Sequence, residues 1–217
     1  MIEAPPPIVI VLDHVKPENI RRIPDTRGGN TYNAARATGA DGREREHQDN
    51  AAQVVKEELE RLGVDVVIKT PEDFGNYQDY DVYIRNQSSM GYIVLPLHFD
   101  AEVGKGGVGF LTRVRPGDIE DKKLANRIDK ALFNFYTQNQ ELGNFRNTDY
   151  LPNMTLDVAS PGPATLVEMG SMVAWEEHYG TSFTSTSKFR QLARLIAKSI
   201  VGNKIPPLMC PSGWRKK

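Results

Sequence analysis

Short apolar runs alternate with longer segments of helical apolar spacing, and this alternation is the feature that most constrains the fold. The runs that predict buried strands lie at 8–12, 64–69, 92–97, 107–113 and 163–167. Apolar residues at helical spacing predict helices at about 51–62, 118–139 and 187–202. The sequence therefore predicts an α/β fold with a mostly parallel or mixed twisted sheet flanked by helices.

The length of the chain favours a single domain. Its 217 residues suffice for one sizeable core and are too few for two. We expect this domain to span residues 1–203 and an irregular tail to follow at 204–217. A polar, glycine-dotted stretch at 21–46 has almost no apolar periodicity, and loops of this length in a domain are often functional.

Charge and cysteine content exclude several classes of protein. The 27 Lys and Arg residues nearly balance the 28 Asp and Glu residues, and no basic stripe favours nucleic acid or an anionic membrane as partner. The single cysteine, Cys210, excludes an internal disulfide and a cysteine-based zinc site. Any metal would therefore be held by His, Asp or Glu.

The N-terminal segment predicts neither export nor membrane insertion. It has no basic leader, and the apolar run Ile8–Leu12 is too short for a signal-peptide core or a membrane span. From the sequence as it stands, we expect a chain that is made in the cytoplasm.

Ionisable side chains follow three of the predicted strands. "PPIVIVLDH" ends on Asp13 and His14, "YIVLPLH" on His98, and "PATLVE" on Glu168. Because the carboxyl ends of parallel strands meet at one edge of a sheet, we expect these side chains to lie close together. Burying any of them unpaired is costly, so they are expected to face one another or a metal. Glu46, at the front of the first helix, is a further candidate that the helix dipole favours in its ionised form.

This set of side chains contains the parts of a catalytic zinc site. Two histidines and a carboxylate with an open position are typical ligands, and the zinc lowers the pKa of its bound water. A second carboxylate that does not bind the metal is needed to move the proton. Taken singly, each residue also has an ordinary structural interpretation: a strand-end histidine, a first-turn glutamate, or an ion pair of Glu168 with Arg85 or Arg190.

Five segments resemble the zinc-dependent N-acetylmuramoyl-L-alanine amidases, the cell-wall hydrolases of bacterial envelopes and phage endolysins. They are "IVIVLDH", "REREHQDNAAQVVKEELERLGVDV", "LPLHFDA", "GGVGFLT" and "PATLVEMG", and the resemblance runs from Ile8 to Val201. It implies that one Zn²⁺ per chain is bound by His14, Glu46 and His98. It implies also that Glu168 is the catalytic base, and that 1–203 is a catalytic zinc amidase domain.

The sequence departs from the family around its ligands. Asp13 and Val15 stand where the family has glycines beside its first histidine, and Pro96 and Asp100 replace a serine and an asparagine around the second. The ligand glutamate of the family is followed four residues later by asparagine, as Glu46 is here by Asn50. Glu44 and His47 lie so close to Glu46 that either is an alternative ligand.

The resemblance implies hydrolysis of the amide between N-acetylmuramic acid and L-alanine in peptidoglycan by a monomeric enzyme. Segments 27–42 and 144–162 are candidates for shaping the substrate groove. A wall hydrolase without a leader is expected to be a phage lysin or a domain separated from an exported protein.

Two other functions remain open from the sequence. A zinc carboxypeptidase or a deacylase of small N-acyl amino acids would use the same residues in similar roles. A non-catalytic binding module that retains the fold is the alternative of a different class.

Overall fold

The computed structural model describes residues 5–19, 21–23, 44–100, 109–142, 144–145 and 154–202. Its strands form one six-stranded sheet in the order β2-β1-β3-β6-β4-β5. The strands are β1 (Ile8–Val11), β2 (Val66–Lys69), β3 (Ile93–Asp100), β4 (Gly109–Arg113), β5 (Asn144–Phe145) and β6 (Leu166–Ser171). β1, β2, β3 and β6 are parallel, whereas β4 runs antiparallel to β6. The predicted α/β fold with a mixed sheet is confirmed.

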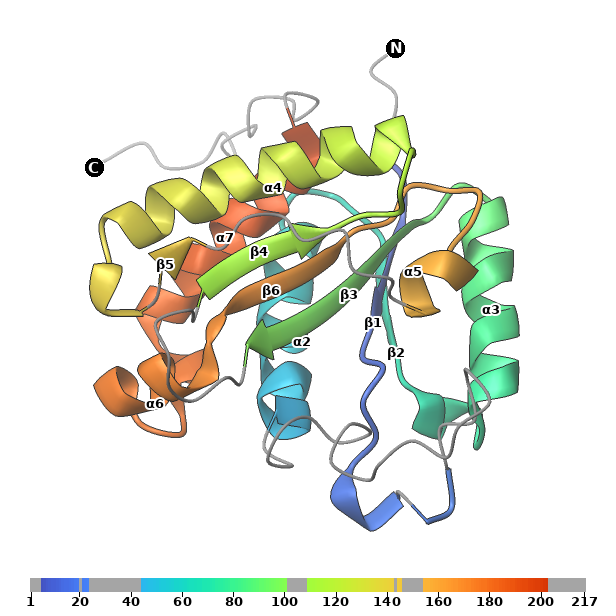
Figure 1. The fold of residues 1–217 in the computed structure, drawn as a ribbon, viewed down its shortest axis with the longest axis horizontal. Helices are drawn as coiled ribbons and strands as arrows, with labels where there is room; N and C mark the ends of the chain where they lie inside the picture. Colours follow the sequence, from blue (N-terminus) through green and yellow to red (C-terminus); the bar gives the residue numbers. More distant parts are fainter. Residues whose placement is uncertain are drawn as a thin grey trace, which may run out of the picture.

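Helices cover both faces of the sheet (Figure 1). The α-helices are α2 (Glu44–Glu60), α3 (Tyr77–Ser89), α4 (Ile119–Thr137), α5 (Met154–Val158), α6 (Met172–Tyr179) and α7 (Ser187–Val201). Short 3₁₀ turns are η1 (Pro17–Asn19), η2 (Pro71–Asp73), η3 (Gln140–Leu142) and η4 (Phe183–Ser185). The larger core cluster joins one sheet face to α2, α4, α6 and α7, and the smaller cluster joins the other face to α3 and α5.

The predicted helices have clear physical ends. The side chain of Asp118 accepts a hydrogen bond from Asp121 N at the start of α4, and Thr186 caps α7 in the same way. Gly202 ends α7 with a φ of 65°, a left-handed conformation that glycine adopts without strain. Among the described residues, no helix is both long enough and apolar enough to cross a membrane.

The sequence did not predict α3, α5 and α6. The buried residues of α3 are chiefly Tyr77, Tyr80 and Ile84, which lie at helical spacing within an otherwise polar segment. Two of the three are tyrosines, so the apolar signal was weak. The helices α5 and α6 have only five and eight residues, too short to show a periodic pattern.

The strand registers place the ionisable residues in one row. Val11 pairs with Pro96 on β3, and His98 pairs with Glu168 on β6. Asp13 follows Val11 by two residues and His98 follows Pro96 by two, so Asp13 and His98 lie side by side. Because side chains alternate along a strand, Asp13, His98 and Glu168 belong to the sheet face that α3 and α5 cover.

Candidate metal centre

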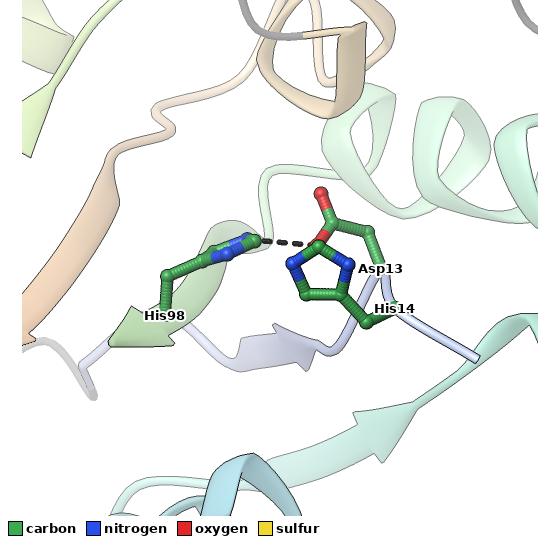
Figure 2. A group of neighbouring side chains, drawn as sticks. All are labelled: Asp13, His14 and His98. Atoms are coloured by element: carbon green, nitrogen blue, oxygen red, sulfur yellow. Dashed lines mark ion pairs between the residues drawn. The ribbon is translucent and has the colours of Figure 1, made fainter. Parts of the chain in front are cut away.

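Asp13, His14 and His98 meet at the carboxyl edge of the sheet (Figure 2). One nitrogen or oxygen atom from each lies within 4.8 Å of the others, and the three form a group that could hold a metal ion. The two imidazole rings lie edge to face, with their centroids 4.9 Å apart. Asp13 and His98 are buried, and His14 is partly accessible. The predicted meeting of the first and third strand ends is therefore present in the structure.

Glu44, the first residue of α2, contacts both histidines. Its Oε2 lies 3.4 Å from Nε2 of His14, and its Oε1 lies 3.1 Å from Nδ1 of His98. Oε1 also accepts hydrogen bonds from the backbone N–H of Phe99 and the side-chain amide of Gln48. These contacts hold a buried carboxylate between two imidazoles.

The structure gives Glu44 the position that the sequence predicted for Glu46. The side chain of Glu46 is exposed, because a shift of two residues turns a helical side chain by about 200°. The buried face of α2 runs from Ala51 and Val55 back through Gln48 to Glu44. Extending that spacing backwards would have found Glu44. Gln48, four residues after Glu44, takes the place of the amide residue that Asn50 was expected to provide.

His47, the other alternative ligand, lies outside the metal cluster. Its Nε2 lies 2.8 Å from Oε1 of Glu176 on α6, and its ring packs against Phe183 and Phe99. This histidine therefore connects α2 to α6.

Glu168 lies beside His98 on the neighbouring strand, and its side chain is largely buried. Its Oε1 lies 3.7 Å from the guanidinium of Arg113 on β4. Arg190, one of the partners considered from the sequence, instead binds Glu57 and Glu58 of α2. The structure thus brings Glu168 close to the histidine cluster, with a cation on its β4 side.

The buried charges shift one another's pKa values. Burial alone would lower the pKa of His98, but the Asp13 and Glu44 carboxylates outweigh this effect and raise the pKa well above its usual range. Burial likewise opposes the charge on His14, and Glu44 again raises the pKa. Burial would raise the pKa of Glu44, but His14 and His98 outweigh it and lower the pKa. Glu44 and the two histidines therefore favour one another's charged forms, and a metal bound by these histidines would displace their protons.

The donor types around the two histidines suit a zinc ion. Zinc accepts imidazole nitrogen and carboxylate oxygen. Asp13, His14 and His98 each offer one such atom within 4.8 Å of the others. Glu44 is a further carboxylate in reach of both histidines, with Oε2 3.4 Å from His14 and Oε1 3.1 Å from His98.

Comparison with known proteins finds likeness in structure and not in sequence. No protein-family profile matches the chain, and no curated protein matches it. One similar solved structure is the N-acetylmuramoyl-L-alanine amidase of Clostridium difficile 630, with 18% sequence identity and a TM-score of 0.56 over 91% of this chain and 96% of that one. Another is the apo form of the N-acetylmuramyl-L-alanine amidase Ami1 of Mycobacterium abscessus, with 17% identity and a TM-score of 0.60 over 91% of this chain and 98% of that one. A third is the catalytic domain of the CD27L endolysin targeting Clostridia difficile, with 19% identity and a TM-score of 0.61 over 89% of this chain and 95% of that one. The chain thus has the α/β fold of the N-acetylmuramoyl-L-alanine amidases.

Proposed function

We propose that the chain is a divergent N-acetylmuramoyl-L-alanine amidase that uses one Zn²⁺ to hydrolyse the amide between N-acetylmuramic acid and L-alanine in peptidoglycan. The observation that carries this proposal is the contact of Glu44 with both His14 and His98, beside Glu168, at the carboxyl edge of the sheet. The fold shared with structures of such amidases supports the choice of reaction.

In this proposal His14, Glu44 and His98 hold the metal, and Glu44 replaces Glu46 as the expected carboxylate ligand. The bound zinc would supply a Lewis acid for the scissile carbonyl and an acidified water. Gln48 and the backbone N–H of Phe99 keep the Glu44 carboxylate oriented towards the histidines. Burial of the cluster limits competing water and strengthens its electrostatic interactions.

Glu168 is the proposed general base and acid. Its carboxylate accepts the proton of the attacking water and returns it to the alanine nitrogen as the amide breaks. The place of Glu168 next to His98 in the sheet register brings it to the same edge as the proposed ligands. The Arg113 guanidinium provides a favourable partner for the charged form of this carboxylate.

The rest of the enzyme's description remains a prediction. It comprises a catalytic zinc amidase domain at 1–203, a monomeric state, peptidoglycan as the macromolecular partner, and a lysin or exported origin. The tail 204–217 and the segment 27–42 lie outside the described residues, as do 146–153 of the second proposed groove segment.

The test is the release of new N-terminal alanine from purified peptidoglycan. Zinc-loaded protein is expected to release it, chelator-treated protein is not, and Glu168→Gln is expected to release it far more slowly. A small N-acyl amino acid is assayed in parallel. Cleavage of that substrate with intact peptidoglycan left uncut would contradict the amidase proposal and favour a small-substrate hydrolase. No hydrolysis of either substrate would favour a binding module.

A further inference from the structure

The pairing of β3 with β6 becomes irregular immediately after two residues of the candidate site. His98 pairs with Glu168. The next pair joins Asp100 to Ser171, so β6 has one residue more than β3 between the two pairs. A β-bulge of this kind increases the local twist of a strand, and bulges are frequent next to active sites, where they redirect a side chain. Here the bulged residues are Met169–Gly170, which directly follow the proposed base.

Gly170 gives the bulge a backbone conformation that other residues rarely adopt. Its φ is 119°, in the positive range that glycine occupies without a steric penalty. Space is also limited here, because a Cβ atom built on Gly170 would overlap the hydroxyl oxygen of Tyr136. Since glycine moves readily between backbone conformations, it does not by itself fix the geometry of the bulge. A contact from outside the strand is able to do so.

Tyr136, a buried residue of α4, makes that contact. Its hydroxyl donates a hydrogen bond to the backbone oxygen of Met169 and accepts one of 3.1 Å from the indole N–H of Trp175 on α6. Its ring stacks on Phe110 of β4, with the ring centroids 4.5 Å apart. Burial raises the pKa of Tyr136, so the hydroxyl keeps the proton that it donates. The peptide unit that joins the two bulged residues is therefore held by a side chain that is itself fixed by α6 and β4.

The Tyr136 hydroxyl acts from behind the sheet. Met169 and Tyr136 belong to the larger core cluster, on the face that α4, α6 and α7 cover. Because side chains alternate along a strand, Glu168 points to the other face. Tyr136 thus reaches Glu168 through the backbone of β6, at the residue that follows Glu168.

We propose that Tyr136 is a positioning residue for Glu168: its hydroxyl, held by Trp175, fixes the bulge and with it the direction in which the end of β6 presents the Glu168 carboxylate. This inference rests on the proposed function, since Glu168 is the proposed base. It gives the Tyr136–Trp175 pair a part in the reaction that is separate from packing the core.

The first test is the rate of Tyr136→Phe, which loses the hydroxyl and keeps the ring that stacks on Phe110. With zinc and solubilised peptidoglycan strands, we expect a kcat about 10–100-fold lower than that of the wild type, because small displacements of a catalytic group have effects of this size. KM and zinc affinity should stay unchanged. Tyr83→Phe, which removes the hydroxyl of a partly buried tyrosine on α3, is the matched control and should keep the wild-type kcat. A folded Tyr136→Phe with the wild-type kcat would contradict the proposal.

The carboxyl group of Glu168 gives a second measurement, which needs no activity. In the full chain with ¹³C-labelled glutamate carboxyls, the NMR signal of Glu168 is assigned with Glu168→Gln, and that of Glu58 with Glu58→Gln. Tyr136→Phe is expected to shift or broaden the Glu168 signal and to leave the Glu58 signal unchanged. A tyrosine that only packs the core would lower the melting temperature without moving the Glu168 signal, and this result would overturn the positioning role. A wild type that cleaves no peptidoglycan would overturn the proposed function instead, so the two failures are distinguishable.

Gly170→Ala tests the same contact from the backbone side, and it replaces Tyr136→Phe if that variant does not fold. The added methyl group would overlap the Tyr136 hydroxyl, so the bulge has to shift. We expect a loss of kcat at least as large as that in Tyr136→Phe, with one zinc still bound. Gly63→Ala is the matched control, because Gly63 also has a positive φ but no atom within 4 Å of an added Cβ. Thermal unfolding shows which variants fold, and a folded Gly170→Ala with the wild-type kcat and Glu168 signal would contradict the role of the bulge.

Discussion

The helix α2 carries two buried glutamates, Glu44 at its first turn and Glu58 near its end. Both have a lowered pKa, and in both the partners' charges outweigh the effect of burial. Glu44 faces His14 and His98, whereas Glu58 binds the guanidinium groups of the α7 arginines.

The side chains that contact each glutamate distinguish a candidate metal site from a structural contact. An arginine stays protonated under all ordinary conditions, so the Glu58 cluster is complete as it stands and connects α2 to α7. A histidine can give up its proton and offer the same nitrogen to a metal. A buried carboxylate alone therefore indicates little about function; Glu44 differs from Glu58 in facing two side chains that are able to bind a metal.

The largest difference between the two glutamates is expected in zinc binding. Glu44→Gln should lose stoichiometric zinc and peptidoglycan cleavage, because an amide is a poor replacement for a carboxylate ligand. Glu58→Gln should keep both. Glu46→Gln, on the exposed side of the same helix, is the second control. The measurements are the zinc content by atomic absorption and the release of alanine from peptidoglycan. Loss of zinc in Glu46→Gln, with zinc retained in Glu44→Gln, would restore Glu46 as the proposed ligand.

Glu168→Gln is expected to separate chemistry from metal binding. The variant should bind one zinc with unchanged affinity and cleave peptidoglycan about 10²–10⁴-fold more slowly, the usual contribution of a general acid–base group. The measurements are zinc titration and initial rates of alanine release. Zinc loss in this variant would instead make Glu168 a ligand.

The sequence predicted the sheet and the row of strand ends because buried parallel strands are nearly continuous apolar runs. β1, β3 and β6 are of this kind, and each leads to a residue of the cluster or to Glu168. The sequence could not decide between Glu44 and Glu46, because which of the two side chains faces the sheet depends on the residue at which the helix begins. That start follows a polar segment without periodicity.

The sequence also could not predict which side chain holds the Asp13 carboxylate. Thr155 lies 142 positions further along the chain, in the five-residue helix α5. A single hydroxyl in a short segment has no pattern of its own, and only the packing of α5 on the sheet brings it to Asp13. The Arg113–Glu168 contact between β4 and β6 depended in the same way on a strand order that the sequence did not specify.

Glu58 should affect stability more than function. Replacing it by glutamine leaves a neutral group among Arg190, Arg194 and Arg61, all partly exposed. Since solvent screens these arginines, we expect a loss of about 1–2 kcal/mol in the free energy of unfolding. Urea unfolding of zinc-free protein at pH 7 measures it. A loss well above this range would show that the α2–α7 contact depends on Glu58 more than its solvent-facing partners suggest.

The smallest expected effect is the pH dependence of the difference in unfolding free energy between the wild type and Glu58→Gln. The arginines lower the pKa of Glu58 in the folded protein below its unfolded value of about 4.3. Its stabilising contribution is therefore fully present above the unfolded pKa and is lost as the pH falls through the folded pKa. The gap in unfolding free energy between wild type and Glu58→Gln should stay constant from pH 7 to about pH 5 and shrink below that. Urea unfolding of both proteins across this range tests it, and a gap that widens on acidification would mean that Glu58 is stabilised in its protonated form.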